Sequence, residues 1–187
     1  WDLPDPILRG DRVLARACDD LAGVAAMLVL LQKLGRKRAR GEVYCLFTRA
    51  EEVGFIGALG AARARTLPSD TQVISVETSS TLPHAPVGGG PIVRVGDRVA
   101  VYSPDLTAFC VRVAQELADR RKGFTFQRKL MDGGACEANA FLAHGYAATG
   151  ICLALGNYHN MHVARQRIAS EFVSLKDWAG MVELFEA

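Results

Sequence analysis

Two adjacent carboxylates, Glu51 and Glu52, directly follow the apolar run 43–47. If that run is a β-strand, neighbouring side chains at its exit point to opposite sides of the chain. One carboxylate can then bind a metal ion while the other reaches the water on that ion. This division of roles is typical of metal-assisted hydrolysis, so the pair predicts a hydrolytic metal site.

Three other segments supply candidate ligands for such a site, namely Asp19 or Asp20, Glu77, and His159 or His162. Carboxylates and imidazoles suit zinc, manganese or cobalt. An aspartate such as Asp19 can bridge two ions about 3.5–4 Å apart. Glu51 would then pass a proton from the metal-activated water to the leaving amine. Each residue has an ordinary structural explanation by itself, and their order along the chain is what favours a shared site.

Strand and helix patterns alternate along the chain, which favours a mostly parallel sheet covered on both faces. The expected strands are 43–48, 71–76, 91–102, 124–129 and 147–155, and the expected helices are 21–34, 57–65, 107–122, 136–144 and 174–187. We therefore predict an α/β fold with three layers, α/β/α, around a mostly parallel mixed sheet. Ligands of such sheets sit outside the carboxyl ends of the strands, where the acidic pair, Glu77 and the two histidines fall.

Composition narrows the classes of protein. A chain of 187 residues fits one domain, and we expect no second one. The net charge of +2 gives no reason to expect a nucleic-acid partner, and the basic run 36–40 is interpreted as a solvated helix end. No apolar stretch is long enough to predict a membrane span. Five cysteines without a CxxC pair predict neither a disulfide framework nor a thiolate site, which suits the cytoplasm.

Several short segments, in this order, resemble one family of enzymes. They are 18–23 with its aspartates, 48–54 with the paired glutamates, 75–78, 133–138 with its Gly-Gly turn, and 157–160. As a set they resemble the catalytic domain of the co-catalytic di-zinc exopeptidases, in particular the glutamyl-aminopeptidase and tetrahedral-aminopeptidase group. The resemblance implies a zinc-exopeptidase-like fold and metal-dependent hydrolysis of the peptide bond at the N-terminus of peptides.

The resemblance also implies metal and catalytic roles. Asp19 would be the bridging ligand and Glu51 the general base, while Glu52 and His159 would hold one ion. Glu77 would bind the other ion, although the aminopeptidases commonly carry an aspartate there. His162 is the alternative to His159. Two zinc ions are expected per complete site, and manganese or cobalt would also suit these ligands.

Substrate contacts are expected at Gly133, Gly134 and, as an approximate match, Glu137. The family's first ligand, a histidine in a His-x-Asp segment, has no counterpart in residues 1–18. Residues 1–187 are therefore interpreted as the C-terminal part of a zinc-peptidase catalytic domain, with a homo-oligomer or the absent N-terminal segment as expected partners beside the peptide substrate. The alternatives are a carboxypeptidase or N-acyl amino acid amidohydrolase of the same clan, and a non-catalytic scaffold subunit.

Overall fold

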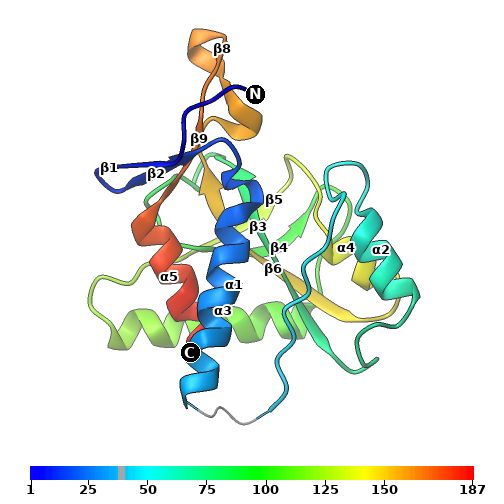
Figure 1. Cartoon of the computed structure of the whole chain (residues 1–187). Coiled ribbons are helices and arrows are strands. Elements are labelled where there is room, and N and C mark those ends of the chain that lie inside the picture. The colour runs from blue at the N-terminus through cyan, green and yellow to red at the C-terminus, as the bar shows by residue number, and fades with distance from the viewer. Residues whose placement is uncertain (38–40) are drawn as a thin grey trace.

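A four-stranded mixed sheet lies at the centre of the computed structural model, which describes residues 1–37 and 41–187 (Figure 1). Its strand order is β3 (Gln72–Ser80), β6 (Ala147–Leu155), β4 (Ile92–Asp97) and β5 (Gln127–Met131). The β3–β6 and β4–β5 pairs are parallel, and the β4–β6 pair is antiparallel. The sheet is therefore mixed and mostly parallel, as predicted.

Helices cover both faces of this sheet. One core cluster joins α1 (Cys18–Lys37), α3 (Pro104–Arg120) and α5 (Leu175–Glu186) to the side of β6 that carries Ile151, Leu153 and Leu155. A second cluster joins α2 (Ile56–Arg63) and α4 (Ala138–Leu142) to the opposite side. All but the first residue of β6 are buried, as a strand covered on both faces requires. The predicted three-layer α/β/α architecture is confirmed.

A smaller antiparallel sheet was not predicted. It consists of β1 (Ile7–Arg9), β2 (Arg12–Ala15) and β9 (Glu171–Ser174), with β2 in the middle. Its strands are three or four residues long, too short for a clear alternation of apolar and polar residues. The sheet places β9 beside the start of α1, which proves important for the site.

The segment 157–168, for which no strand or helix was predicted, carries short regular elements. Two single turns of 3-10 helix, η1 (Tyr158–Asn160) and η2 (Val163–Arg165), alternate with the paired strands β7 (Met161–His162) and β8 (Arg167–Ile168). Figure 1 shows this segment projecting beside the N-terminus.

The prediction of a buried strand at 43–48 is wrong. The segment belongs to no strand of the described sheets, and Val43, Tyr44 and Phe47 are exposed. An apolar run becomes a strand only where a neighbouring strand accepts and donates its backbone hydrogen bonds. No strand of residues 1–37 or 41–187 does so here.

Other boundaries shift by a few residues. The strand expected at 124–129 is β5, which begins at Gln127, and the strand expected at 71–76 is β3, which continues to Ser80. The basic run begins in the last turn of α1, and its residues 38–40 lie outside the described part of the chain. Within residues 1–37 and 41–187, no helix is both long and apolar enough to cross a membrane.

Candidate metal centre

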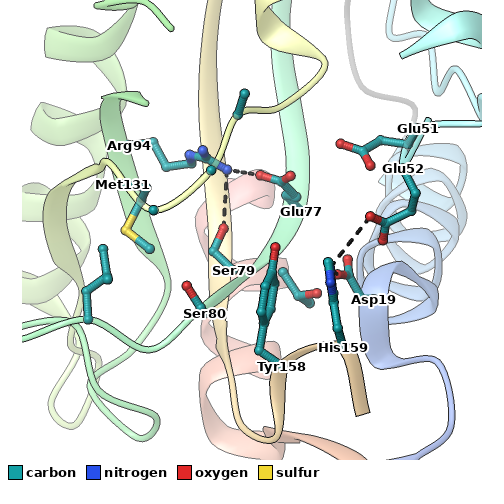
Figure 2. A pocket seen from close by; sticks show the side chains of 15 residues that line it. Asp19, Glu51, Glu52, Glu77, Ser79, Ser80, Arg94, Met131, Tyr158 and His159 are labelled. Carbon is teal, nitrogen blue, oxygen red and sulfur yellow. Dashed lines mark hydrogen bonds and ion pairs between the residues drawn. The ribbon is translucent and has the colours of Figure 1, made fainter. Parts of the chain in front are cut away.

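A polar pocket lies at the carboxyl end of β3, beside the start of α1 (Figure 2). It collects side chains from α1, from the turn before α2, from β3, from β4 and from η1. The lining residues are Asp19, Glu51, Glu52, Glu77, Thr78, Ser79, Ser80, Leu82, Arg94, Met131, Gly133, Gly134, Ala135, Tyr158 and His159. Each of the predicted metal and catalytic residues lines this one pocket.

The two aspartates at the start of α1 have different roles. Asp20 accepts a hydrogen bond from the backbone N–H of Gly23 at 3.0 Å and so caps the helix. A Cβ at Gly23 would lie 2.1 Å from the Asp20 carboxylate, so the cap requires glycine there. Asp19 instead lines the pocket, and its backbone N–H donates to Glu171 Oε2 on β9 at 3.1 Å. Of the two aspartates left open by the sequence, Asp19 is therefore the one in the pocket.

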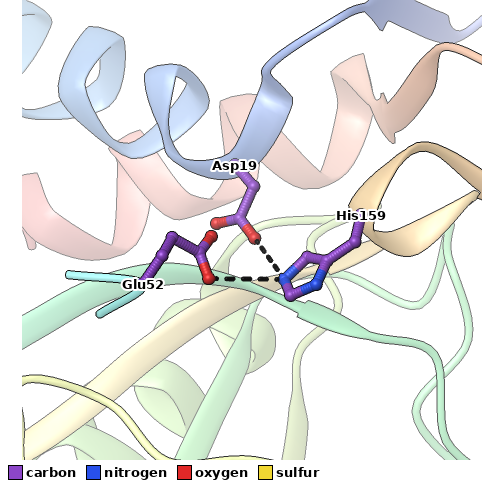
Figure 3. Close-up of side chains that lie close together, drawn as sticks. All are labelled: Asp19, Glu52 and His159. Carbon is purple, nitrogen blue, oxygen red and sulfur yellow. Dashed lines mark ion pairs between the residues drawn. The ribbon is translucent and has the colours of Figure 1, made fainter. Parts of the chain in front are cut away.

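Asp19, Glu52 and His159 form a compact cluster (Figure 3). His159 Nε2 lies 3.8 Å from Asp19 Oδ2 and 3.6 Å from Glu52 Oε2, and all three ligand atoms are within 4.8 Å of one another. In a tetrahedral zinc site with ligand bonds of about 2.1 Å, ligand atoms lie roughly 3.4 Å apart. The cluster therefore fits one divalent ion. Three protein ligands with an open side is also the arrangement of catalytic zinc sites.

The loop that carries His159 is held by its neighbours. Asn160 is buried and donates to the backbone carbonyl of Arg16 at 3.0 Å, and Asn157 donates to that of Ser170 at 2.8 Å. The ring of Tyr158 stacks on His159 with 3.8 Å between the centroids. His162 lies in β7, outside both the pocket lining and the cluster.

Two acidic residues of the pocket, Asp19 and Glu51, and the neighbouring Asp20 have raised pKa values. Burial, with the Glu52 carboxylate as the next cause, raises the pKa of Glu51 to about 7. Burial also raises the pKa of Asp19 to about 6, and it raises that of Asp20 well above its usual range. A bound cation would favour the ionised forms of these groups.

Glu77 faces a different partner. Its carboxylate makes an ion pair with the guanidinium of Arg94 on β4, which also donates to Ser79 Oγ at 3.3 Å. A second acid, Asp97, lies 3.9 Å from the same guanidinium. Figure 2 shows Arg94 and Glu77 on one side of the pocket and the cluster of Figure 3 on the other. Among the described residues, Glu77 is not part of a group placed to hold a metal ion.

The predicted substrate residues divide in two. Gly133 and Gly134 line the pocket, whereas Glu137 does not. The Glu137 carboxylate instead accepts a hydrogen bond from Thr48 Oγ1 at 2.5 Å, just before the paired glutamates. Burial raises the pKa of Glu137 as well.

Three residues of the site were missed by sequence reasoning. Arg94 had a signal, because a lone charge inside the apolar strand 91–95 calls for a buried partner. Tyr158 is adjacent to the predicted ligand His159, although nothing local indicates stacking. Glu171 contacts Asp19, a residue 152 positions away in the sequence, and no local pattern indicates such a contact.

The layered α/β fold carries, at its strand ends, a carboxylate–imidazole cluster that could hold a metal ion. The comparisons with known proteins agree. A model of the family described as M42 glutamyl aminopeptidase matches residues 4–184. The chain therefore belongs to the M42 glutamyl aminopeptidase family, and this membership implies a divalent metal ion.

Individual relatives are more distant. The aminopeptidase APDkam598 from the archaeon Desulfurococcus kamchatkensis is 25% identical with a TM-score of 0.78, covering 100% of this chain and 51% of that one. The TET1 peptidase of Pyrococcus horikoshii is 24% identical with a TM-score of 0.80, covering 97% and 51%, and shows the fold alone. A curated relative from Acetivibrio thermocellus, with a provisional aminopeptidase name, is 29% identical over 138 residues. This match covers 71% of this chain and 39% of the relative. The chain thus spans about half the length of the solved structures.

Proposed function

We propose that the protein hydrolyses the peptide bond at the N-terminus of peptides as a metal-dependent aminopeptidase. The observation that carries the proposal is the cluster of Asp19, Glu52 and His159 beside Glu51, in a chain of the M42 family. Zinc is the ion we propose, because two carboxylates and one imidazole suit it; manganese and cobalt suit the same ligands. When bound, the ion supplies Lewis acidity to the scissile carbonyl and to a water molecule.

Glu51 is the group we assign to proton transfer. It lines the same pocket as the cluster, and a carboxylate beside the bound ion can accept a proton from water and return it to the leaving amine. The backbone carbonyl of Glu51 accepts hydrogen bonds from Gly54 at 3.1 Å and Phe55 at 2.9 Å. This turn holds the base in position at the end of an otherwise irregular segment.

The charge of the pocket favours a substrate with a free amine. Among the residues that the structure describes, four acidic ones line it, whereas the single lining arginine is already paired with Glu77. A positively charged α-amino group suits such a site, while a terminal carboxylate finds no unpaired lining arginine or lysine. This supports aminopeptidase activity over a carboxypeptidase. Gly133 and Gly134 leave room along the wall for the substrate backbone.

A Glu51→Gln variant tests the proposal. We expect hydrolysis of an aminoacyl anilide to fall by about 10²–10⁴-fold, because the amide cannot accept the proton. Zinc binding, measured by calorimetry, should persist because Glu51 is outside the cluster. The matched control is Glu42→Gln, an exposed change nearby that should leave activity intact. Full activity in Glu51→Gln would contradict the proposal. So would cleavage of the N-acetylated form of the same anilide at the rate of the free-amine form.

Assembly and location are finer parts of the proposal. The TET1 peptidase of Pyrococcus horikoshii assembles into a tetrahedron or an octahedral shell. We propose that this chain also joins copies of itself or an N-terminal segment, and the exposed Val43, Tyr44 and Phe47 support an apolar contact. Five unpaired cysteines support a cytoplasmic location.

A further inference from the structure

Arg94 is a buried cation in an apolar strand. Its side chain is 2% exposed, and its neighbours Ile92 and Val93 on β4 are fully buried. A guanidinium loses its hydration on burial, so it is kept only where acids compensate its charge. The acids that do so here are Glu77 and Asp97.

The fold provides a path for Arg94 to reach Glu77. The two residues lie on β4 and β3, which are separated by β6. Arg94 is in register with Gly150 of β6, while Glu77 is in register with Cys152. A Cβ at Gly150 would lie 3.1 Å from Arg94 Cδ and 3.2 Å from the Tyr102 ring. The glycine therefore leaves the space over β6 that the arginine side chain crosses.

Of its two acidic partners, Glu77 is the closer to Arg94. Asp97 already accepts hydrogen bonds from Tyr102 Oη at 2.8 Å, from Asn139 Nδ2 at 2.6 Å and from the backbone N–H of Cys136 at 3.0 Å. Its distance of 3.9 Å from the guanidinium is that of a looser pair. Glu77 is in direct contact with the guanidinium and is 15% exposed toward the pocket.

A second divalent ion does not fit this arrangement. The candidate carboxylate is Glu77, which lies outside the cluster and is already bound to a positive charge. An ion at Glu77 would sit beside the guanidinium as a like charge. Displacing Arg94 would leave a buried cation without its closest partner.

We propose that the guanidinium of Arg94 takes the place of a second metal ion on Glu77, so that the pocket holds a single divalent ion at Asp19, Glu52 and His159. The inference rests on the proposed metal site and goes beyond it by assigning Glu77 to a protein cation. Arg94 is thereby a positioning residue, which fixes Glu77 and sets the metal content of the site.

The test is the zinc content of the whole chain after equilibrium dialysis, with affinities from calorimetry. We expect one ion per chain in the wild type, and one ion in Glu77→Gln with an affinity changed by less than about tenfold. Arg94→Lys, which keeps the cation, should also bind one. Arg94→Met should bind a second, weaker ion that is lost again when Glu77→Gln is added.

Two ions in the wild type, falling to one in Glu77→Gln, would overturn the inference and leave the proposed metal site standing. A folded Arg94→Met chain that still binds one ion would overturn it too; if that variant fails to fold by circular dichroism, the Glu77→Gln result decides. No ion in the wild type would overturn the proposed metal site, and the inference with it. Asp19→Asn is the control that should remove the single ion.

Discussion

The two sides of the pocket treat their carboxylates in opposite ways. On one side, Asp19 and Glu51 are partly buried beside other acids, and burial raises the pKa of each. Behind the other side, Asp97 does not line the pocket and is held by several hydrogen-bond donors beside Arg94; its pKa is lowered although burial alone would raise it. The second group contains its own cation, Arg94.

This difference between the two groups of carboxylates indicates which of them needs a metal ion. Carboxylates taken partly out of water need a positive charge or hydrogen-bond donors nearby to stay ionised. Arg94 and backbone N–H groups provide these for Glu77 and Asp97. The cluster of Asp19, Glu52 and His159 has no lysine or arginine in ion-pair contact among the described residues, which is why we propose that a metal ion compensates its charge.

Removing the internal cation should produce the largest effect. We expect Arg94→Met to lower the free energy of unfolding by about 3–5 kcal/mol, because buried acids lose their partner. Chemical denaturation measures this. The control Arg98→Met, at an exposed position four residues along the chain, should change stability by less than about 0.5 kcal/mol. Equal effects in the two variants would mean that the Arg94 ion pair contributes nothing special.

Removing His159 from the cluster, on the opposite side of the pocket from Arg94, should weaken metal binding. We expect His159→Ala to weaken zinc binding by at least about 100-fold, more than the loss of an outer-shell partner costs. Its fold should remain, because the histidine is half exposed and the loop is held by Asn157 and Asn160. His162→Ala is the matched control and should keep the wild-type affinity. The reverse ranking would make His162 the ligand.

The pH dependence of stability should be the smallest effect, and it should differ between the metal-free and metal-bound forms. In the metal-free fold, Asp19 and Glu51 keep protons that the unfolded chain has already released, since their pKa values are about 6 and about 7. Their contribution is full below about pH 4 and disappears as pH rises through 6 to 7.

Metal-free protein should therefore be more stable near pH 5 than near pH 7.5, by roughly 1–2 kcal/mol after allowance for solvent screening. Thermal unfolding with a chelator measures this. With zinc the trend should reverse, because the ion binds the ionised carboxylates. A metal-free stability that rises between pH 5 and 7.5 would contradict the assigned pKa shifts.

Local signals were enough for much of the fold. The apolar run 147–155 is β6 with the predicted bounds, and the helical pattern 107–122 is α3 with a slightly earlier start. The strand predicted at 43–48 failed because its apolar residues indicate burial or pairing without naming a partner. The small β1–β2–β9 sheet was missed because its ends are far apart in sequence.

The site, like the fold, could be predicted in part from the sequence. The sequence by itself predicted which residues share a site, and the structure places Asp19, Glu51, Glu52 and His159 in the lining of one pocket. Only the tertiary structure decided how their charges are balanced, that Asp20 caps a helix, and that Glu77 faces Arg94. The physical reason is that motif and periodicity act within a few residues. An ion pair between two strands that are separated by a third depends on strand order, on register and on the space left by a single glycine.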